Sequence, residues 1–340
     1  MRLGSGIRKE FDMRPKRPLV TGIYGVVVAA LVVLAGIDAG NSAAGASARN
    51  KLTLMAPAAP GGGWDLAARE SQQALRSSGV VNNAQVVNVP GAGGTIGLSQ
   101  TVGRAGDETT LMVTGTVMLG AVEVNGSEHG LDDVTPIARL ADDYVVVVVP
   151  ADSPYQTLDD FLADWRSNPH GTAIGGGSLG GTDHLLAGLL AQEGGVDPGS
   201  LNYISYAGGG EVMTALLSHT VAVGVSGYND FSDQIEAGRL RALGVSAAEP
   251  VEGIEIPTFI EQGVDVELPN WRGVMAPPGL TDEARAEMEA IITEMVETEE
   301  WADALDRNRW ADTFMVGEEF EEFLDQDIAR IRQVIEELGL

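Results

Sequence analysis

The stretch Leu52-Thr53-Leu54-Met55-Ala56-Pro57-Ala58-Ala59-Pro60-Gly61-Gly62-Gly63-Trp64-Asp65 contains the pattern that decides the fold. The apolar run at 52–55 predicts a strand, the prolines and glycines predict a turn, and a helix-length segment begins near residue 65. The same order of strand, glycine turn and helix recurs with turns at 90–95, 175–183 and 206–211. This alternation is typical of βαβ units, so we predict an α/β protein with a largely parallel sheet.

Short apolar runs predict strands at residues 52–55, 85–89, 110–114, 144–149, 172–174, 203–205, 221–225 and 240–245. The continuous β-branched run at 145–149 is typical of a strand that is buried on both faces. Helices are predicted to begin near residues 65, 96, 157, 182, 211, 231, 281, 298 and 318. The acidic segment 281–340 has helical periodicity, which predicts amphipathic helices with one solvated face.

Size and composition limit the class of protein. A chain of 340 residues exceeds one ordinary compact core, which favours two lobes. The net charge of −28 argues against nucleic-acid binding, because a polyanion needs a basic footprint. The absence of cysteine excludes disulfides, thiol catalysis and cysteine-ligated metals. The four histidines show no ligand spacing, so we predict no metal site and no cofactor.

The first 48 residues have the layout of an export signal. Six basic residues precede an uncharged run at 19–37, and small residues with A-x-A sites follow it. We expect cleavage after this segment, although the run is also long enough to remain as a membrane anchor. A lipid anchor is disfavoured because the chain has no cysteine. In either case the rest of the chain is expected outside the cytoplasm, in the periplasm or on the outer face of the membrane.

Two breaks in the pattern suggest where the chain passes between lobes. A Pro-rich turn lies at 150–154, and a segment rich in Ala, Glu and Pro lies at 247–257. We therefore expect lobe 1 to contain residues 51–146 plus 246–340, and lobe 2 to contain residues 147–245.

The four glycine turns predict a ligand site. In open α/β sheets, ligands bind beyond the carboxyl ends of the strands, where these turns lie. Glycines allow close approach of the backbone, and free N–H groups at helix starts bind anions. With two turns in each lobe facing one cleft, we expect a small carboxylate to be held without any lysine or arginine.

Several side chains near these turns have two interpretations. Asp65, Thr182 and Glu211 stand at predicted helix starts, where they either cap the helix or contact the ligand. Ser178 and Ser226 are further candidates for hydroxyl donors. Two aromatic residues could line the cleft or pack in the core: Trp64 and Trp271.

Enzymatic interpretations have weaker support. The run Gly176-Gly177-Ser178-Leu179-Gly180 matches the G-x-S-x-G pattern of serine hydrolases. That triad requires a late histidine, and only His184 and His219 follow Ser178. The run at 91–97 is spaced G-x-G-x-x-x-G and lacks the acidic residue of a dinucleotide site. We therefore predict no catalytic residues and keep a Ser178 hydrolase as an alternative.

Six short motifs in register resemble the substrate-binding proteins of tripartite tricarboxylate transporters, also called Bug receptors. They occur between residues 51 and 340, at 60–69, 87–94, 182–185, 206–210, 238–243 and 271–279. The family's usual P-D-G-Y-T-L stretch is replaced at 105–111, and residues 226–230 match its pattern poorly.

This resemblance implies a two-lobed periplasmic-binding-protein fold of type II, with a ligand cleft between the lobes. It also implies a monomeric receptor that delivers a di- or tricarboxylate, or a similar acid, to the integral-membrane permease subunits of the transporter. By position, lobe 1 would contribute Gly62, Gly63 and Asp65 to the ligand site. Lobe 2 would contribute Ser178, Thr182 and the turn at 208–210. A solute-sensing module that docks onto a signalling protein remains an alternative.

The glycine turns and the resemblance together give the predicted ligand-binding residues: Gly62, Gly63, Trp64, Asp65, Gly93, Gly94, Thr114, Ser178, Thr182, Asp183, Gly208, Gly209, Gly210 and Ser226.

Overall fold

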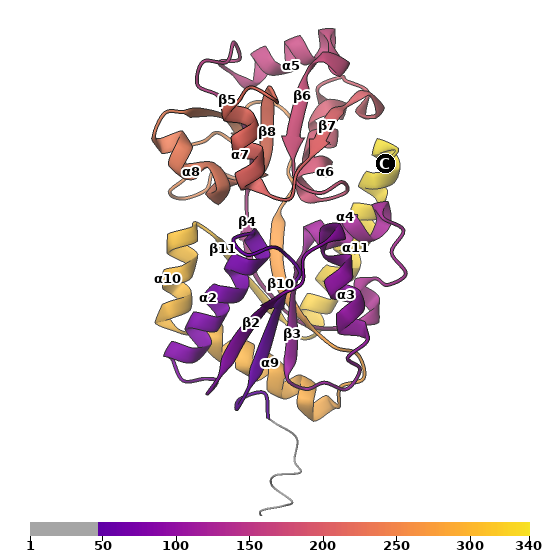
Figure 1. Cartoon of the computed structure of the whole chain (residues 1–340), viewed down its shortest axis with the longest axis vertical. Coiled ribbons are helices and arrows are strands. Elements are labelled where there is room, and N and C mark those ends of the chain that lie inside the picture. The colour runs from indigo at the N-terminus through magenta and orange to yellow at the C-terminus, as the bar shows by residue number, and fades with distance from the viewer. Residues whose placement is uncertain (1–46) are drawn as a thin grey trace, which may run out of the picture. The chain divides into compact units, whose positions relative to one another are not determined.

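The computed structural model describes residues 47–340 (Figure 1). The export signal or anchor predicted at residues 1–48 therefore lies almost entirely outside the described residues. Between residues 47 and 340, no helix combines the length and the apolar character needed to cross a bilayer.

The first sheet has six strands in the order β11-β4-β10-β3-β1-β2. Its strands come from both ends of the described chain: β1 (Leu52–Ala56), β2 (Ala84–Asn88), β3 (Thr110–Gly115), β4 (Thr135–Asp143), β10 (Asn270–Ala276) and β11 (Ala311–Val316). The second sheet has five strands in the order β7-β6-β8-β5-β9. These strands are consecutive in the middle of the chain: β5 (Val145–Pro150), β6 (Ala173–Gly176), β7 (Asn202–Ser205), β8 (Val223–Gly227) and β9 (Leu240–Val245).

All strands predicted from apolar runs are present, with ends that shift by a few residues. The prediction of a largely parallel sheet is wrong, because both sheets are mixed. Strand β1 pairs in parallel with β2 and β3, and β6 does so with β7 and β8. Strands β5 and β10 are antiparallel to both of their neighbours, and β11 is antiparallel to β4. Strands β5 and β10 are the first strands after the two passages between the sheets, whereas β11 joins the first sheet after α9 and α10.

The chain changes sheets at two places. Strand β4 ends at Asp143 and β5 begins at Val145, so Tyr144 alone separates the two sheets there. The return runs from β9 to β10 through residues 246–269. Ser246 ties the two crossings together, because its Oγ accepts from the Val145 N–H at 3.1 Å and donates to the Leu268 carbonyl at 3.1 Å. Whether the two sheets move as the separate lobes predicted from the sequence stays a prediction.

Helices lie on both faces of each sheet (Figure 1). Helices α2, α9 and α10 contact one another beside the first sheet, whereas α3 contacts α4 and α4 contacts α11. The helix bounds are α2 (Gly63–Ser77), α3 (Thr95–Val102), α4 (Thr116–Val124), α5 (Leu158–Ser167), α6 (Thr182–Glu193), α7 (Gly209–Leu217), α8 (Tyr228–Glu236), α9 (Asp282–Val296), α10 (Glu299–Asn308) and α11 (Glu318–Leu338). Short 3₁₀ turns are η1 (Ala92–Gly94), η2 (Leu131–Asp133), η3 (Pro169–Gly171) and η4 (Pro198–Ser200).

The C-terminal helix α11 contacts helices that belong to both sheets. It packs against α4 of the first sheet and against α6 of the second. A Cβ placed on Gly188 of α6 would lie 2.5 Å from a methyl carbon of Leu338, so the glycine is what allows this close approach. The segment 281–340 is thus helical, as predicted, apart from the interposed strand β11.

Candidate functional site

The helices that follow three of the glycine turns begin without a side-chain cap. Helices α2, α6 and α7 are preceded by Gly62, Gly181 and Gly208, and none has a capping hydrogen bond from a side chain. Helices α5, α9 and α10 instead have threonine caps whose hydroxyls accept a backbone N–H: Thr157, Thr281 and Thr298. No side chain therefore caps these three helices, and uncapped first-turn N–H groups are where anions bind to proteins.

Asp65 holds the turn before α2 in place. Its Oδ2 accepts from the Gly61 N–H and from Arg69 Nε, both at 2.8 Å, and its Oδ1 accepts from Asn88 Nδ2 at 2.8 Å. Burial alone would raise the pKa of Asp65, but these hydrogen bonds hold that pKa below its usual value. Both oxygens are engaged by the protein, so Asp65 positions the loop and neither caps α2 nor reaches freely toward a ligand.

Arg272 on β10 lies directly against the start of α2. A Cβ placed on Gly63 would lie 2.6 Å from Nη1 and 2.7 Å from Nη2 of Arg272. Nη2 also donates to Oδ2 of Asp143, and Arg272 is 6% exposed. Nε of Arg272 is buried and has no hydrogen-bond partner among the described residues. A guanidinium with a free donor thus lies beside the free N–H groups of a helix start.

Three carboxylates gather next to this guanidinium, and we call Asp143, Asp183 and Asp230 the acidic cluster. A Cβ placed on Gly227 would lie 3.2 Å from Oδ2 of Asp143 and 3.5 Å from Oδ2 of Asp230. Asp183 Oδ2 accepts from the Gly177 N–H at 2.8 Å. The cluster joins the end of β4 to the starts of α6 and α8, so it draws on both sheets.

Burial, together with electrostatic repulsion, raises the pKa values of two members of the acidic cluster. Burial, followed by the nearby charges of Asp230 and Asp143, raises the pKa of Asp183 to about 7. Burial and the charge of Asp143 likewise raise the pKa of Asp230 above its usual value. Asp183 is only half-buried and Asp230 is exposed, so protein crowds each carboxylate while one side stays open to solvent. Both residues thus retain some solvent-exposed surface.

Ser226 and the start of α7 complete this part of the site. Ser226 is 5% exposed and its Oγ donates to Oδ2 of Asp230 at 2.8 Å. A Cβ on Gly209 would lie 2.3 Å from the carboxyl carbon of Asp230. The carboxylate of Asp230 therefore lies over the start of α7, where the sequence predicted an open anion site formed by Gly208, Gly209 and Gly210.

A second contact between the sheets involves the turn before α3. Gly93 and Gly94 have φ values of +61° and +95°, which favour glycine. A Cβ on Gly93 would lie 3.8 Å from Cβ of Ser178, and one on Gly94 would lie 2.6 Å from the Trp64 ring. The structure thus brings Gly93 and Ser178 together, while Trp64, 6% exposed, packs in the core behind them.

Three of the sequence candidates are engaged inside the protein. Thr114 is fully buried and its hydroxyl lies 3.4 Å from Sδ of Met118. The Thr182 hydroxyl donates to Oδ1 of Asn270 at 3.3 Å, which links α6 to β10. Trp271 is fully buried and its ring N–H donates to Asp327 at 2.7 Å. Core packing, and not a cleft wall, is the role that the structure gives to Trp271.

The Ser178 hydrolase alternative finds no support in the geometry. The nearby His184 is buried, and its Nδ1 accepts from the Gly180 N–H at 3.1 Å. Burial also lowers the pKa of His184, which keeps the ring neutral. His184 therefore braces the glycine loop, and its Nδ1 is already engaged as an acceptor.

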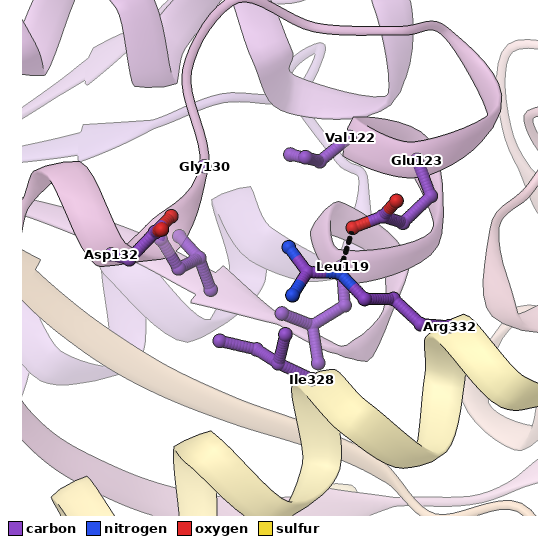
Figure 2. Close-up of a pocket in the computed structure, with 8 residues that line it drawn as sticks. Leu119, Val122, Glu123, Gly130, Asp132, Ile328 and Arg332 are labelled. Atoms are coloured by element: carbon purple, nitrogen blue, oxygen red, sulfur yellow. Dashed lines mark hydrogen bonds and ion pairs between the residues drawn. The ribbon is translucent and has the colours of Figure 1, made fainter.

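Two surface hollows lie elsewhere. One is lined by α4, η2 and α11, and Figure 2 shows the ion pair across it, with Nε of Arg332 2.5 Å from Oε1 of Glu123. The other, about 350 Å³, lies at the outer edge of the second sheet near Arg241, Glu255 and Pro257. Neither hollow includes a predicted site residue or a member of the acidic cluster.

Sequence reasoning missed Arg272, Asp143 and Asp230. Arg272 and Asp143 are 129 positions apart, so no local motif contains the pair. One signal was available, because a charged side chain inside the run Trp271-Arg272-Gly273-Val274-Met275-Ala276 must find a partner if that run is a buried strand. The sequence-based expectation of a carboxylate held without lysine or arginine did not consider Arg272, which lies beside the start of α2.

Comparison with known sequences gives one family. The family model described as tripartite tricarboxylate transporter family receptor matches residues 68–340. Protein BugT of Bordetella pertussis is 27% identical over 319 residues, which cover 92% of this chain and 96% of that protein.

Solved structures show the same fold. A Rhodopseudomonas palustris protein solved with adipate matches with a TM-score of 0.77 and 21% identity, over 85% of this chain and 97% of its own. MatC from the same organism, solved with bound malate, matches with a TM-score of 0.74 and 21% identity, over 84% of this chain and 99% of its own. The prediction of a periplasmic-binding-protein fold is confirmed, because the solved structure of the periplasmic binding protein BugD also matches, with a TM-score of 0.76 and 20% identity over 85% of this chain and 98% of its own.

Proposed function

Because this chain belongs to the tripartite tricarboxylate transporter family of solute receptors, which are binding proteins and not enzymes, we propose that it captures a small organic carboxylate between its two sheets. The carboxylate would be held by the free N–H groups at the start of α2 and by Arg272. The solute would then be presented to a membrane permease of the tripartite type.

The observation that carries this proposal is the position of Arg272 against Gly63. An arginine has five donors in a planar fork that matches a carboxylate. Here one hydrogen bond goes to Asp143, while Nε is buried without a partner among the described residues. A buried donor without a partner destabilises the protein, and a bound carboxylate would satisfy it.

Two further considerations support an organic acid. The relatives solved with malate and with adipate share the fold, and both of those ligands are dicarboxylates. The helix dipole of α2 also favours negative charge at its first turn, where Asp65 and not a capping side chain shapes the loop.

The location and the partner form part of the proposal. Receptors of this family work as periplasmic binding proteins, so we place residues 49–340 outside the cytoplasm, as a monomer that meets its permease at the membrane. Capture would use closure of the first sheet, with its helices, onto the second sheet about Tyr144 and the segment that returns to β10.

A thermal-shift panel of dicarboxylates, tricarboxylates, amino acids and aromatic acids, with neutral sugars as controls, tests the proposal. A ligand at 100 times its dissociation constant adds about 2.7 kcal/mol of apparent stability, which is a shift of a few degrees at this size. We expect a shift from one class of acid and none from sugars. Native mass spectrometry before the panel shows whether a copurified solute occupies the protein, and the panel uses protein without one.

Two glycine variants supply a matched control for the site. Gly63→Ala places a Cβ within 2.6 Å of the Arg272 guanidinium and should abolish the shift. Gly210→Ala meets no heavy atom within 4 Å and should keep it. A flat panel from the ligand-free wild-type protein, or equal shifts from acids and sugars, would contradict the proposed function.

A further inference from the structure

Two buried Arg–Asp pairs lie near each other at the junction of β4 with β10, and they differ in one respect. Arg139 donates to Asp142 through Nε at 3.1 Å and through Nη2 at 2.6 Å to each oxygen, and Thr313 also donates to Asp142 at 2.9 Å. Arg272 makes one hydrogen bond to Asp143 and keeps Nε without a partner among the described residues. In the first pair, Nε and Nη2 of Arg139 both donate to Asp142. In the second pair, Nε of Arg272 has no acceptor among the described residues, so it could donate to a ligand.

When all three carboxyls of the acidic cluster are ionised, the charges around Arg272 do not balance. The acidic cluster contributes three carboxylates, and Arg272 is the cation that touches it. Ser226 donates to Asp230 with its one hydroxyl proton, and the Gly177 N–H donates to Asp183. Neutral donors orient these carboxylates but add no positive charge. A dicarboxylate brought to this place would add further negative charge beside Asp183 and Asp230.

A metal ion does not fit as the missing cation. Within residues 47–340, no group of three or more His, Asp or Glu side chains is arranged to hold one. An ammonium group is a better match, since it is compact, carries one positive charge and has three hydrogen-bond donors. Asp230 is exposed and Asp183 is half-buried, so an ammonium can reach both.

We propose that the solute is an amino acid, whose carboxylate binds Arg272 and the first turn of α2 while its ammonium group binds between Asp183 and Asp230. Because the carboxylate of Asp230 lies over Gly209, the start of α7 would attract a cation instead of an anion. The inference rests on the proposed function, because it assumes that the carboxylate is held at α2.

Isothermal titration at pH 8 with matched acids tests this. The pairs are aspartate with malate, glutamate with 2-hydroxyglutarate, 2-aminoadipate with 2-hydroxyadipate, and alanine with lactate, each differing only by an ammonium in place of a hydroxyl. We expect at least one amino acid to bind about tenfold or more tightly than its hydroxy partner. Hydroxy acids that bind as tightly as the amino acids, or more tightly, overturn the inference and leave the proposed function intact. Binding of neither class overturns the inference, and the thermal-shift panel of other acids then decides the proposed function.

A pair of variants on α8 locates the ammonium. Asp230→Asn should weaken binding of the amino acid about tenfold or more without weakening binding of its hydroxy partner. Asp233→Asn removes the same charge from an exposed position one turn later on α8 and should change neither affinity. An equal loss for both ligands in Asp230→Asn overturns the inference. The wild-type titration decides the question by itself if Asp230→Asn does not fold.

Discussion

Nη2 of Arg272 donates to Oδ2 of Asp143, and the two side chains are 8% and 5% exposed. The pair links β10 to the last residue of β4, one residue before the chain enters the second sheet. The only direct connection between the two sheets at this point, through Tyr144, is therefore braced by a buried ion pair that also faces the start of α2.

We expect Arg272→Gln to lower the free energy of unfolding by about 3–5 kcal/mol, because it leaves the buried Asp143 carboxylate without its counter-charge. Urea unfolding followed by circular dichroism measures this. Arg332→Gln breaks an ion pair whose side chains are 55% and 31% exposed, and should cost at most about 1 kcal/mol. Equal losses in the two variants would contradict the burial of the Arg272 pair.

Two adjacent glycines at the start of α7 should respond differently to alanine. A Cβ on Gly209 would lie 2.3 Å from the carboxyl carbon of Asp230, whereas one on Gly210 meets no heavy atom within 4 Å. Gly209→Ala should displace Asp230 and weaken binding of the solute, measured by titration. Gly210→Ala should preserve binding and raise stability by about 0.5–1 kcal/mol, as alanine favours a helix. Similar behaviour of the two variants would show that Asp230 does not lie over Gly209.

The fold was predictable where apolar runs and glycine turns mark the ends of strands and helices. The apolar run that became β5 and the glycine turns before α2, α6 and α7 were placed within a few residues. Strand β4 was missed because Thr135-Pro136-Ile137-Ala138-Arg139-Leu140-Ala141-Asp142-Asp143 mixes charges with apolar residues, and those charges are paired only in the folded protein. Helix α4 was missed because it follows β3 directly, without any turn residues between them.

The site was predictable only in part, for a related reason. Glycines that admit a close neighbour leave a local signal, so Gly63 and Gly209 could be proposed from the sequence. The side chains that lie against these two glycines could not be predicted. Arg272 comes from a strand 209 residues after Gly63, and Asp230 comes from a different helix than Gly209. The chemistry proposed for the site depends on these distant side chains, which no local pattern in the sequence brings together.

The loop before α2 should depend on Asp65. Asp65→Ala removes a buried carboxylate that accepts from the Gly61 N–H, Arg69 and Asn88, so these three hydrogen bonds to a charged group are lost. We expect a loss of about 1–3 kcal/mol in the free energy of unfolding, together with weaker binding. Arg69→Gln disturbs only the half-exposed partner and should cost at most about 1 kcal/mol. Hydrogen exchange at Gly61 should accelerate in Asp65→Ala alone, and an unchanged rate there would count against this role.

The raised pKa of Asp183, about 7, predicts opposite effects of pH on stability and on binding. The carboxyl faces Asp230 on α8, Asp143 at the end of β4 and Tyr203 on β7, and none of these supplies a positive charge. Its pKa in the unfolded chain is near 3.8, so between about pH 4 and pH 7 the folded state holds a proton that the unfolded state lacks. The stability contributed by this group is complete below pH 4 and is lost as the pH rises through 7.

Asp183→Asn removes that titration, so its free energy of unfolding should depend less steeply on pH between 4 and 7 than that of the wild type, as measured by urea unfolding across this range. Binding should change in the other direction. Only the ionised carboxylate attracts an ammonium group, so the affinity for an amino acid should rise with pH through about 7 and then level off, with proton release on binding near neutral pH. Titration calorimetry in buffers of different ionisation enthalpy measures those protons. An affinity that falls as the pH rises through 7 would instead mean that a protonated Asp183 donates to a second carboxylate, which is how this site would bind a dicarboxylate.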